Sequence, residues 1–329
     1  MTLDGAWTWD FWTAHDGREH HLFYLFAPTS LGDPDRRHRN ARIGHATSPD
    51  LRSWTDHGEV LGPRGKGFDA TATWTGSVVA GPDGRWRMFY TGSRFLHAEP
   101  RHTNVETVGV ALSGDLATWT AQPEPVTVAD RRWYELLEDG TWPEEAWRDP
   151  WVQPAADGDG WDMFVTARAR PRTGIRSDDA GVVGHAWSPD LERWEVRPPL
   201  TAPGSGFAHL EVVQVATVED REFLVFSCAT GALSQERQDR GERGGIFSLP
   251  LDRPLTEPGV PLDVSGARPL SGNGLYSGRV VTDPDGSAVL LAFHDTDADG
   301  RFVGTLSDPL PLHVDAQGLL ALSPVTAPV

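Results

Sequence analysis

The stretch Ile43-Gly-His-Ala-Thr-Ser-Pro-Asp-Leu-Arg-Ser-Trp54 recurs along the chain with little change. The second copy is Val108-Gly-Val-Ala-Leu-Ser-Gly-Asp-Leu-Ala-Thr-Trp119, and the third is Val183-Gly-His-Ala-Trp-Ser-Pro-Asp-Leu-Glu-Arg-Trp194. Each copy contains a short run typical of a strand, a Ser-Pro-Asp or Ser-Gly-Asp turn, and a tryptophan that can close over the unit. Shorter copies follow at Gly245–Leu251 and Val303–Leu310. A unit that recurs in this way predicts a repeat architecture.

Two further segments precede each copy, and both are typical of strands. The nearer segment is an aromatic or β-branched run, found at residues 21–26, 87–91, 162–166, 223–227 and 289–293. The farther segment lies at residues 7–12, 73–78, 148–153, 209–214 and 276–281. Turn signals such as Pro-Asp-Gly join several of these pairs into hairpins. The five cycles predict an all-β fold, a single five-bladed β-propeller with about four strands per blade.

The composition excludes several classes of partner. The 329 residues contain 29 Lys and Arg against 47 Asp and Glu, so the net charge is −18. This charge argues against nucleic-acid and anionic-membrane partners, because phosphate surfaces attract positive charge. No apolar run predicts a membrane span and no secretory pattern is visible at the start, so we expect a cytoplasmic protein of unknown oligomeric state. The single cysteine, Cys228, excludes an internal disulfide, and its strand-like setting predicts a buried, inert thiol.

Acidic residues occur on the first predicted strand of several blades. Because the first strand of each blade lines the central channel of a propeller, polar side chains at matching repeat positions converge there. These positions include Asp10, Asp149 and Glu211, from three different blades. Cleavage of a glycosidic bond requires a carboxylic acid and a carboxylate that flank the bond. Each residue alone could be a solvated or ion-paired channel residue, but their recurrence favours an active site.

Four motifs resemble the invertase–levansucrase superfamily, glycoside hydrolase families 32 and 68. They are Trp9-Asp10-Phe11-Trp12, Trp74-Thr-Gly-Ser77, Arg148-Asp149-Pro150 and Leu210-Glu211, in the order and spacing of the family. The Trp-Asp-x-Trp form is more similar to the levansucrase branch than to invertases. Since no Pro- or Ser-rich linker breaks the repeat, we expect one catalytic propeller domain over residues 1–329, without the C-terminal β-sandwich common in invertases.

The resemblance also implies a role for each carboxylate. Asp10 would be the nucleophile, Glu211 the general acid/base, and Asp149 the transition-state stabiliser that holds fructosyl hydroxyls. The reaction would be a double displacement with retention through a covalent fructosyl-enzyme, in which Glu211 starts protonated. The substrate would be sucrose or a short fructooligosaccharide, and no cofactor or metal is expected. The residues expected to contact the sugar are Trp9, Trp12, Trp74, Thr75, Arg148, His209, Tyr276 and Arg279.

Two positions depart from the family pattern. Thr75 stands where serine is usual, which keeps the hydroxyl and adds a methyl group. Glu211 is followed by Val-Val instead of Cys-Pro or Arg-Pro, which changes the sugar contacts expected there. His209 precedes Glu211 by two residues, so strand alternation places both on one face, where His209 either tunes the acid/base or packs.

Three other functions are compatible with these motifs. A fructosyltransferase of levansucrase type differs only in whether a sugar or water occupies the acceptor site. An arabinofuranosidase or xylosidase of the related five-bladed clan uses a similar set of carboxylates but typically inverts, and the Arg-Asp-Pro triplet weighs against it. A non-catalytic sugar-binding propeller would not need matched carboxylates.

The loops that follow the second strands are rich in arginine, which outnumbers the acidic residues there. We favour an ion-paired, solvated surface, and recognition of a phosphorylated or specialised fructoside is the alternative. Asp295, Asp297 and Asp299 resemble the start of a calcium-binding loop, but Leu306 replaces the glutamate at its twelfth position. We therefore expect an Asp-rich hairpin turn and leave calcium binding open.

Overall fold

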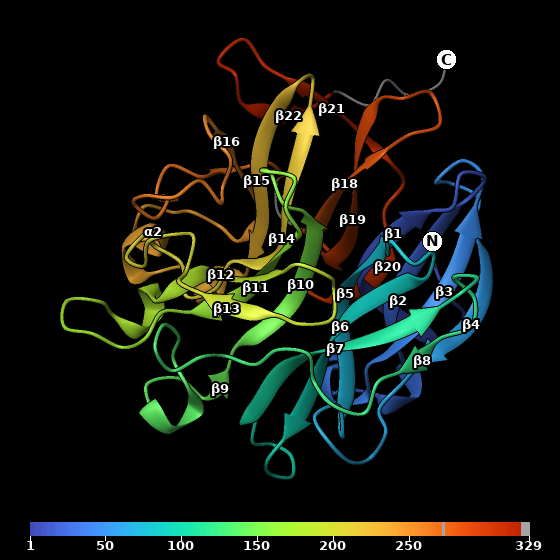
Figure 1. Cartoon of the computed structure of the whole chain (residues 1–329), viewed down its shortest axis with the longest axis horizontal. Coiled ribbons are helices and arrows are strands. Elements are labelled where there is room, and N and C mark those ends of the chain that lie inside the picture. The colour runs from blue at the N-terminus through green and yellow to red at the C-terminus, as the bar shows by residue number, and fades with distance from the viewer. Residues whose placement is uncertain (272–273, 324–329) are drawn as a thin grey trace.

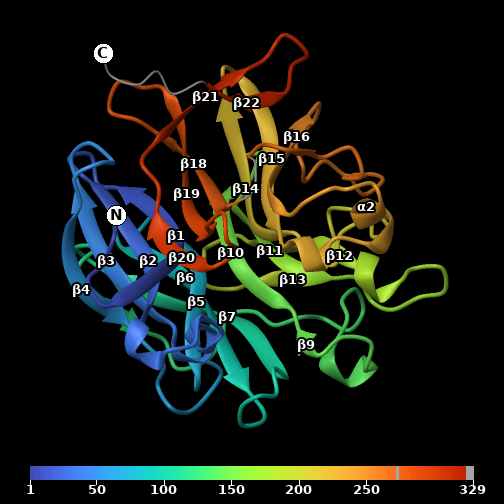
Figure 2. The ribbon, with the colours of Figure 1, turned by 180° about the vertical axis from the view of Figure 1, so that it is seen from behind.

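Five small sheets surround a central axis in the computed structural model, which describes residues 1–271 and 274–323. Figure 1 shows this ring from one side and Figure 2 from the other, with the colours following one another around the ring in chain order. The main path of hydrogen-bonded strands in each sheet follows chain order, and two strands lie beside this path, β9 against β7 and β20 against β19. The structure is therefore the five-bladed β-propeller that the repeat predicts.

Each blade takes its strands from one continuous segment. Blade 1 contains β1 (Ala6–His15), β2 (His20–Pro28), β3 (Arg42–Ser48) and β4 (Thr55–Leu61). Blade 2 contains β5 (Ala72–Ala80), β6 (Trp86–Phe95), β7 (Asn104–Ser113) and β8 (Thr120–Ala121), with β9 (Glu144–Glu145) pairing parallel to β7. Blade 3 contains β10 (Trp147–Pro154), β11 (Trp161–Arg168), β12 (Gly181–Ser188) and β13 (Glu195–Arg197). Blade 4 contains β14 (Glu211–Val218), β15 (Arg221–Cys228), β16 (Gly245–Leu251) and β17 (Arg268–Pro269). Blade 5 contains β18 (Leu275–Thr282), β19 (Ala288–Thr296), β20 (Phe302–Leu306), β21 (Leu310–Val314) and β22 (Leu320–Leu322).

The helices are short and lie in the loops. The α-helices are α1 (Arg37–Asn40) and α2 (Gln235–Asp239), and each follows the second strand of its blade. The 3-10 helices are η1 (Thr29–Leu31), η2 (Pro34–Arg36), η3 (Leu137–Asp139), η4 (Ser177–Asp179) and η5 (Thr230–Ala232). In residues 1–271 and 274–323, no helix has the length and apolar character needed to cross a membrane.

The predicted strand segments coincide with observed strands, with two differences. The copy at 303–310 forms two strands, because β20 and β21 pair with opposite ends of β19. Pro309, which lacks a backbone N–H, lies at the break between them. In blade 4, β14 begins only at Glu211, so His209 precedes the strand.

The repeated Asp-Leu turn ends in a tryptophan that packs across blades. In the first copy, Oδ1 of Asp50 accepts hydrogen bonds from two backbone N–H groups of the turn, at 2.9 and 2.6 Å. The turn places Leu51 in the left-handed region at φ 59°, with its side chain buried. In the second copy, Trp119 of blade 2 packs edge-on against Phe23 of blade 1, with ring centroids 5.5 Å apart. The tryptophan therefore closes over the neighbouring blade.

The first strand of every blade carries a β-bulge next to the channel. The register with the second strand shifts between Thr8 and Phe11, Trp74 and Gly76, Arg148 and Trp151, Glu211 and Gln214, and Tyr276 and Arg279. A bulge breaks the alternation of side chains and re-aims those that lie within it. Inside the bulges, Asp149, Val212 and Ser277 adopt φ values of 58°, 53° and 50°. Because non-glycine residues rarely adopt this conformation, backbone strain is concentrated beside the channel.

The ring closes where blade 1 meets blade 5. The amino group of Met1 donates to the carbonyl oxygen of Leu306 at 2.8 Å, and the N–H of Leu306 donates to the carbonyl oxygen of Met1 at 2.9 Å. The hydroxyl of Thr8 donates to the carbonyl oxygen of Gly304 at 3.2 Å. These bonds join residues that are about 300 positions apart and hold the two ends of the repeat together.

Gly76 offers a test of the bulge geometry, because a Cβ at this position would lie 2.1 Å from the carbonyl oxygen of Phe89. We expect Gly76→Ala to lower the free energy of unfolding by about 1–3 kcal/mol, since backbone must shift to relieve the contact. Denaturant unfolding measures this change. Gly114→Ala is the control, because a Cβ at Gly114 meets nothing within 4 Å. Equal stabilities of the two variants would contradict the prediction.

Candidate active site

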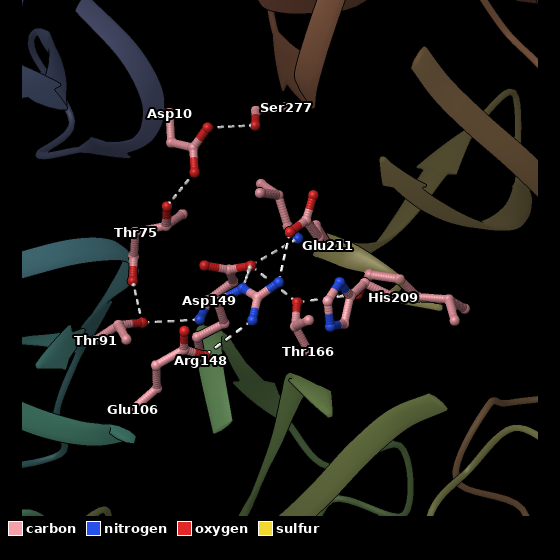
Figure 3. A network of polar contacts seen from close by, with 12 residues as sticks. Asp10, Thr75, Thr91, Glu106, Arg148, Asp149, Thr166, His209, Glu211 and Ser277 are labelled. Carbon is pink, nitrogen blue, oxygen red and sulfur yellow. Dashed lines mark hydrogen bonds and ion pairs between the residues drawn. The ribbon is translucent and has the colours of Figure 1, made fainter. Parts of the chain in front are cut away.

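A cavity of about 340 Å³ lies at the centre of the ring. This volume falls in the range of small-molecule sites. The polar and aromatic side chains that line the cavity are Trp9, Asp10, Arg37, His38, Trp74, Thr75, Glu106, Glu144, Arg148, Asp149, His209, Glu211, Tyr276 and Asp295. Figure 3 shows that the carboxylates of three blades point toward one another, as their matching repeat positions predict.

Asp10 lies in the bulge of β1 and is held by hydroxyl groups from two other blades. Ser277 of β18 donates to Oδ1 at 2.5 Å, and Thr75 of β5 donates to Oδ2. Burial raises the pKa of Asp10, and the hydroxyls of Ser277 and Thr75 counteract part of this rise. Both hydroxyls stabilise the ionised carboxylate and fix its orientation.

Arg148 connects the carboxylates of neighbouring blades. Its Nη1 lies 2.9 Å from Oε2 of Glu106 and 3.3 Å from Oε1 of Glu144. Its Nη2 lies 2.5 Å from Oε1 of Glu211, and the other oxygen of Glu211 accepts a hydrogen bond from the hydroxyl of Tyr276. Since a guanidinium stays charged when buried and presents its donors in a fixed plane, Arg148 holds Glu211 in one orientation.

Asp149 is turned by its bulge toward blade 4. Its Oδ2 accepts hydrogen bonds from the hydroxyl of Thr166 at 2.8 Å and from the backbone N–H of Val212 at 3.2 Å. Its own N–H donates to the hydroxyl of Thr91 at 2.8 Å, so the bulge is tied to both adjacent blades. Burial raises the pKa of Asp149 to about 7, although the positive charge of Arg148 acts in the opposite direction.

Two of the predicted sugar contacts do not line the cavity. Trp12 is fully buried in the core, where it stacks on Phe23 with ring centroids 6.2 Å apart. Arg279 is buried between blades 4 and 5, where its Nη1 donates to the carbonyl oxygens of Val212 (3.2 Å) and Val213 (2.8 Å). Both residues come after the bulge of their strand, which turns their side chains away from the channel. The structure therefore places Trp12 and Arg279 apart from the other residues expected to contact the sugar.

The remaining predicted residues line the cavity together, and the structure adds others that the sequence reasoning missed. The predicted residues are Trp9, Asp10, Trp74, Thr75, Arg148, Asp149, His209, Glu211 and Tyr276. Of the additional residues, Ser277 lies in a bulge like Thr75, so alignment of the repeats could have found it. Glu106 and Glu144 lie on β7 and β9, away from the repeat positions of the first strands. No sequence signal identified these two.

Several arginines in or directly after the loops that follow the second strands form ion pairs with acidic residues. The pairs are Arg36 with Glu99, Arg42 with Glu59, Arg176 with Asp178, Arg237 with Glu242, and Arg240 with Glu236. Oδ1 of Asp297 accepts hydrogen bonds from the N–H groups of Asp299 and Arg301, both at 2.9 Å, which confirms the Asp-rich hairpin turn. Among the residues that the structure describes, no group of three or more His, Cys, Asp or Glu could hold a metal ion. Cys228 is buried, as predicted.

Carboxylates from three blades around one central cavity are typical of enzymes that act on glycosidic bonds. The chain belongs to glycosyl hydrolases family 32, since the model of the family's N-terminal domain matches residues 13–248. It is therefore an enzyme of the glycosidase class, which confirms the resemblance seen in the motifs.

Two curated proteins illustrate the relationship. An extracellular sucrase from Zymomonas mobilis is 25% identical over 357 residues, which cover 97% of this chain and 82% of the sucrase. The β-fructofuranosidase 1 of Zea mays is 28% identical over 193 residues, which cover 57% of this chain and 25% of the maize protein.

Solved structures share the fold at lower sequence identity. An inulosucrase from Halalkalicoccus jeotgali bound to kestose has a TM-score of 0.76 and 22% identity, covering 97% of this chain and 87% of that one. Bacillus subtilis levansucrase has a TM-score of 0.73 and 16% identity, and the match covers 98% of this chain and 87% of the levansucrase. A mutant β-fructofuranosidase from Microbacterium saccharophilum has a TM-score of 0.75 and 17% identity, and the match covers 98% of this chain and 75% of that protein.

Asp149 is expected to make the folded state less stable as the pH rises. Its pKa is raised from 3.8 to about 7, so the folded protein holds this proton more tightly than the unfolded chain. The resulting stabilisation is full below about pH 4 and is lost as the pH rises to about 7, with a slope of up to about 1.4 kcal/mol per pH unit. Asp149→Asn should remove this part of the slope in denaturant unfolding measured across that range. The exposed Asp157→Asn is the control, and an unchanged slope in Asp149→Asn would refute the assignment.

Proposed function

We propose that this chain is a retaining β-fructofuranosidase that cleaves sucrose or a short fructooligosaccharide. The observation that carries the proposal is the convergence of Asp10, Asp149 and Glu211 on one cavity. Asp10 is held by two hydroxyls, and Glu211 is held by Arg148 and Tyr276. Membership of family 32 and relatives named sucrase and β-fructofuranosidase support this substrate class.

In the proposed first step, an oxygen of Asp10 attacks the anomeric carbon of the fructosyl group. The bond to the leaving oxygen breaks as protonated Glu211 donates its proton to that oxygen, and a fructosyl-enzyme forms. Glu211, now ionised, accepts a proton from water, whose oxygen attacks the anomeric carbon and releases Asp10 and fructose. Asp149 accepts hydrogen bonds from fructosyl hydroxyls during both steps.

Two tryptophans supply apolar faces for the substrate. Trp9 and Trp74 line the cavity next to Asp10 and Thr75 in the sequence. The indole N–H of Trp74 donates to the carbonyl oxygen of His38 at 2.8 Å, which fixes its ring. Aromatic side chains combine a large apolar surface with few rotatable bonds, so these rings can bind the C–H faces of a sugar with little loss of entropy.

Fructosyl transfer to a second sugar is the other candidate function. The central cavity shares Ala229, Tyr276 and Asp295 with an adjoining cavity of about 640 Å³, which could admit an acceptor sugar. Hydrolysis and transfer are distinguished by the ratio of free fructose to oligosaccharide as the sucrose concentration rises. The cytoplasmic location stays a prediction, and the name of the Zymomonas relative describes an extracellular protein.

Loss of either reacting carboxylate should abolish turnover. We expect Asp10→Asn and Glu211→Gln to lower kcat on sucrose by at least about 10³-fold with the fold intact by circular dichroism. In the wild type with methanol as acceptor, NMR should show methyl β-fructofuranoside, because two displacements retain the configuration. Near-normal activity in either variant, or the α-anomer as first product, would rule out the mechanism.

The hydroxyl of Thr75 is expected to set the acidic limit of activity. Thr75→Val removes a donor that lowers the pKa of Asp10, so the pKa of Asp10 should rise further and the acid limb of kcat/KM should move to higher pH. The loss of one charged hydrogen bond, about 1.5–3 kcal/mol, corresponds to a fall in kcat/KM of about 10- to 100-fold. Thr75→Ser keeps the hydroxyl and should retain the wild-type pH profile. The prediction fails if the two variants have the same profile.

A further inference from the structure

A segment outside the blade repeat supplies one of the acidic side chains of the cavity. Between β8 and β10 the chain leaves blade 2, forms η3 and returns through β9, where Glu144 pairs with Asn104 in a parallel arrangement. Figure 1 shows β9 beside the lower edge of the ring, between the strands of blades 2 and 3. Glu144 lines the central cavity, so this segment reaches the site from the side.

The carboxylate of Glu144 is held by one of its two oxygens. Oε1 lies 3.3 Å from Nη1 of Arg148 and 3.3 Å from Nε2 of His209, and it accepts a hydrogen bond from the indole N–H of Trp142 at 3.4 Å. In the part of the chain that the structure describes, Oε2 makes no hydrogen bond or ion pair. The side chain is 22% exposed, so this oxygen is open to a ligand in the cavity.

His209 presents a buried nitrogen that also lacks a hydrogen bond. Its residue is 6% exposed, and Nε2 has no hydrogen-bond partner of suitable geometry among the described residues. Trp142 packs edge-on against the imidazole, with ring centroids 5.3 Å apart. Burial, together with the positive charges of Arg148 and Arg168, lowers the pKa of His209 well below its usual value. Burial therefore favours the neutral form of the imidazole.

The position of this pair relative to Asp10 and Glu211 indicates which part of a substrate it meets. Figure 3 shows Asp10 on one side of Glu211 and His209 on the other. In the proposed function the fructosyl carbon lies next to Asp10, and the leaving oxygen lies next to Glu211. His209, which lies on the side of Glu211 away from Asp10, therefore faces the leaving group.

We propose that Glu144 and His209 form a specificity site for the leaving-group sugar, in which they bind hydroxyls of a neutral hexosyl group. The inference rests on the proposed function and extends it to residues outside the catalytic carboxylates. A sugar hydroxyl both donates and accepts hydrogen bonds, so it can donate to Oε2 of Glu144 and accept the N–H of His209 if Nε2 carries the proton. A second hydroxyl can donate to the same carboxylate, because a carboxylate accepts several hydrogen bonds.

The charges around this pair disfavour a phosphorylated leaving group. Glu106, Glu144, Asp149 and Glu211 surround Arg148, so its positive charge is already shared by four carboxyl groups. A phosphate at this position would lie against the carboxylate of Glu144, and like charges in a poorly solvated cavity repel strongly. A neutral polyol avoids this cost and satisfies the buried nitrogen of His209.

The experiment compares two donors that share the fructosyl group and differ in the leaving group. For Glu144→Gln, we expect kcat/KM on sucrose to fall by about 10- to 100-fold, the equivalent of one charged hydrogen bond. On methyl β-D-fructofuranoside, whose leaving group has no hydroxyls to bind, kcat/KM should fall by a smaller factor, which reports only the effect of the change on Arg148 and Glu211. His209→Phe, which keeps a ring against Trp142, should show the same selectivity for sucrose, and the double variant should lose less than the product of the two single losses.

Glu145→Gln is the matched control on the same strand, because Glu145 does not line the cavity and accepts a hydrogen bond from the N–H of Leu137 at 3.0 Å. It should leave both donors unaffected, and thermal unfolding checks that all variants fold. Equal losses of Glu144→Gln on both donors, or no loss on sucrose, would overturn the inference while the proposed function stands. A wild-type protein inactive on both donors would overturn the proposed function and the inference with it.

Discussion

The site depends on one buried guanidinium. Arg148 is 6% exposed and lies within 4 Å of carboxylates from Glu106, Glu144, Asp149 and Glu211. Carboxylates brought this close repel one another, and the permanent positive charge of Arg148 among them reduces this repulsion in a poorly solvated cavity. The same cation orients Glu211. Removal of such a partner leaves uncompensated buried charge, which typically costs about 3–5 kcal/mol.

The propeller supplies this arrangement through bulges rather than through regular strands. A regular strand would send alternate side chains to opposite faces, so Arg148 and Asp149 could not both reach the channel. The bulge of β10 removes this restriction and turns Asp149 to φ 58°. The strain is held in place by bonds between blades, such as the one from the N–H of Asp149 to Thr91. The bulge and the buried carboxylate both disfavour folding at neutral pH, so stability is opposed at this position to the proposed role of Asp149.

The repeat and the segment around β9 contribute different properties. The five first strands bring together Asp10, Asp149 and Glu211, and these residues account for the proposed chemistry on the fructosyl group. The segment between β8 and β10 belongs to no repeat position and adds Glu144 beside His209. Enzymes commonly divide these tasks: a rigid scaffold fixes the reacting groups, and a loop contacts the rest of the substrate. In this chain the loop is tied to β7 by backbone pairing at Glu144 and Glu145, which fixes where Glu144 enters the cavity.

The sequence alone predicted the number of blades, the approximate position of their strands and the three carboxylates of the channel. It did so because Asp-Leu turns and strand-like runs recur in a fixed order. Residues at the same position of the repeat then lie at the same position of each first strand, next to the channel. Three features could not be predicted without the fold: Trp12 packs in the core, Ser277 binds Asp10, and Glu144 enters the cavity. These outcomes depend on where a bulge interrupts alternation and on how a loop returns across neighbouring blades. Contacts between residues far apart in the chain leave no periodic pattern in the sequence.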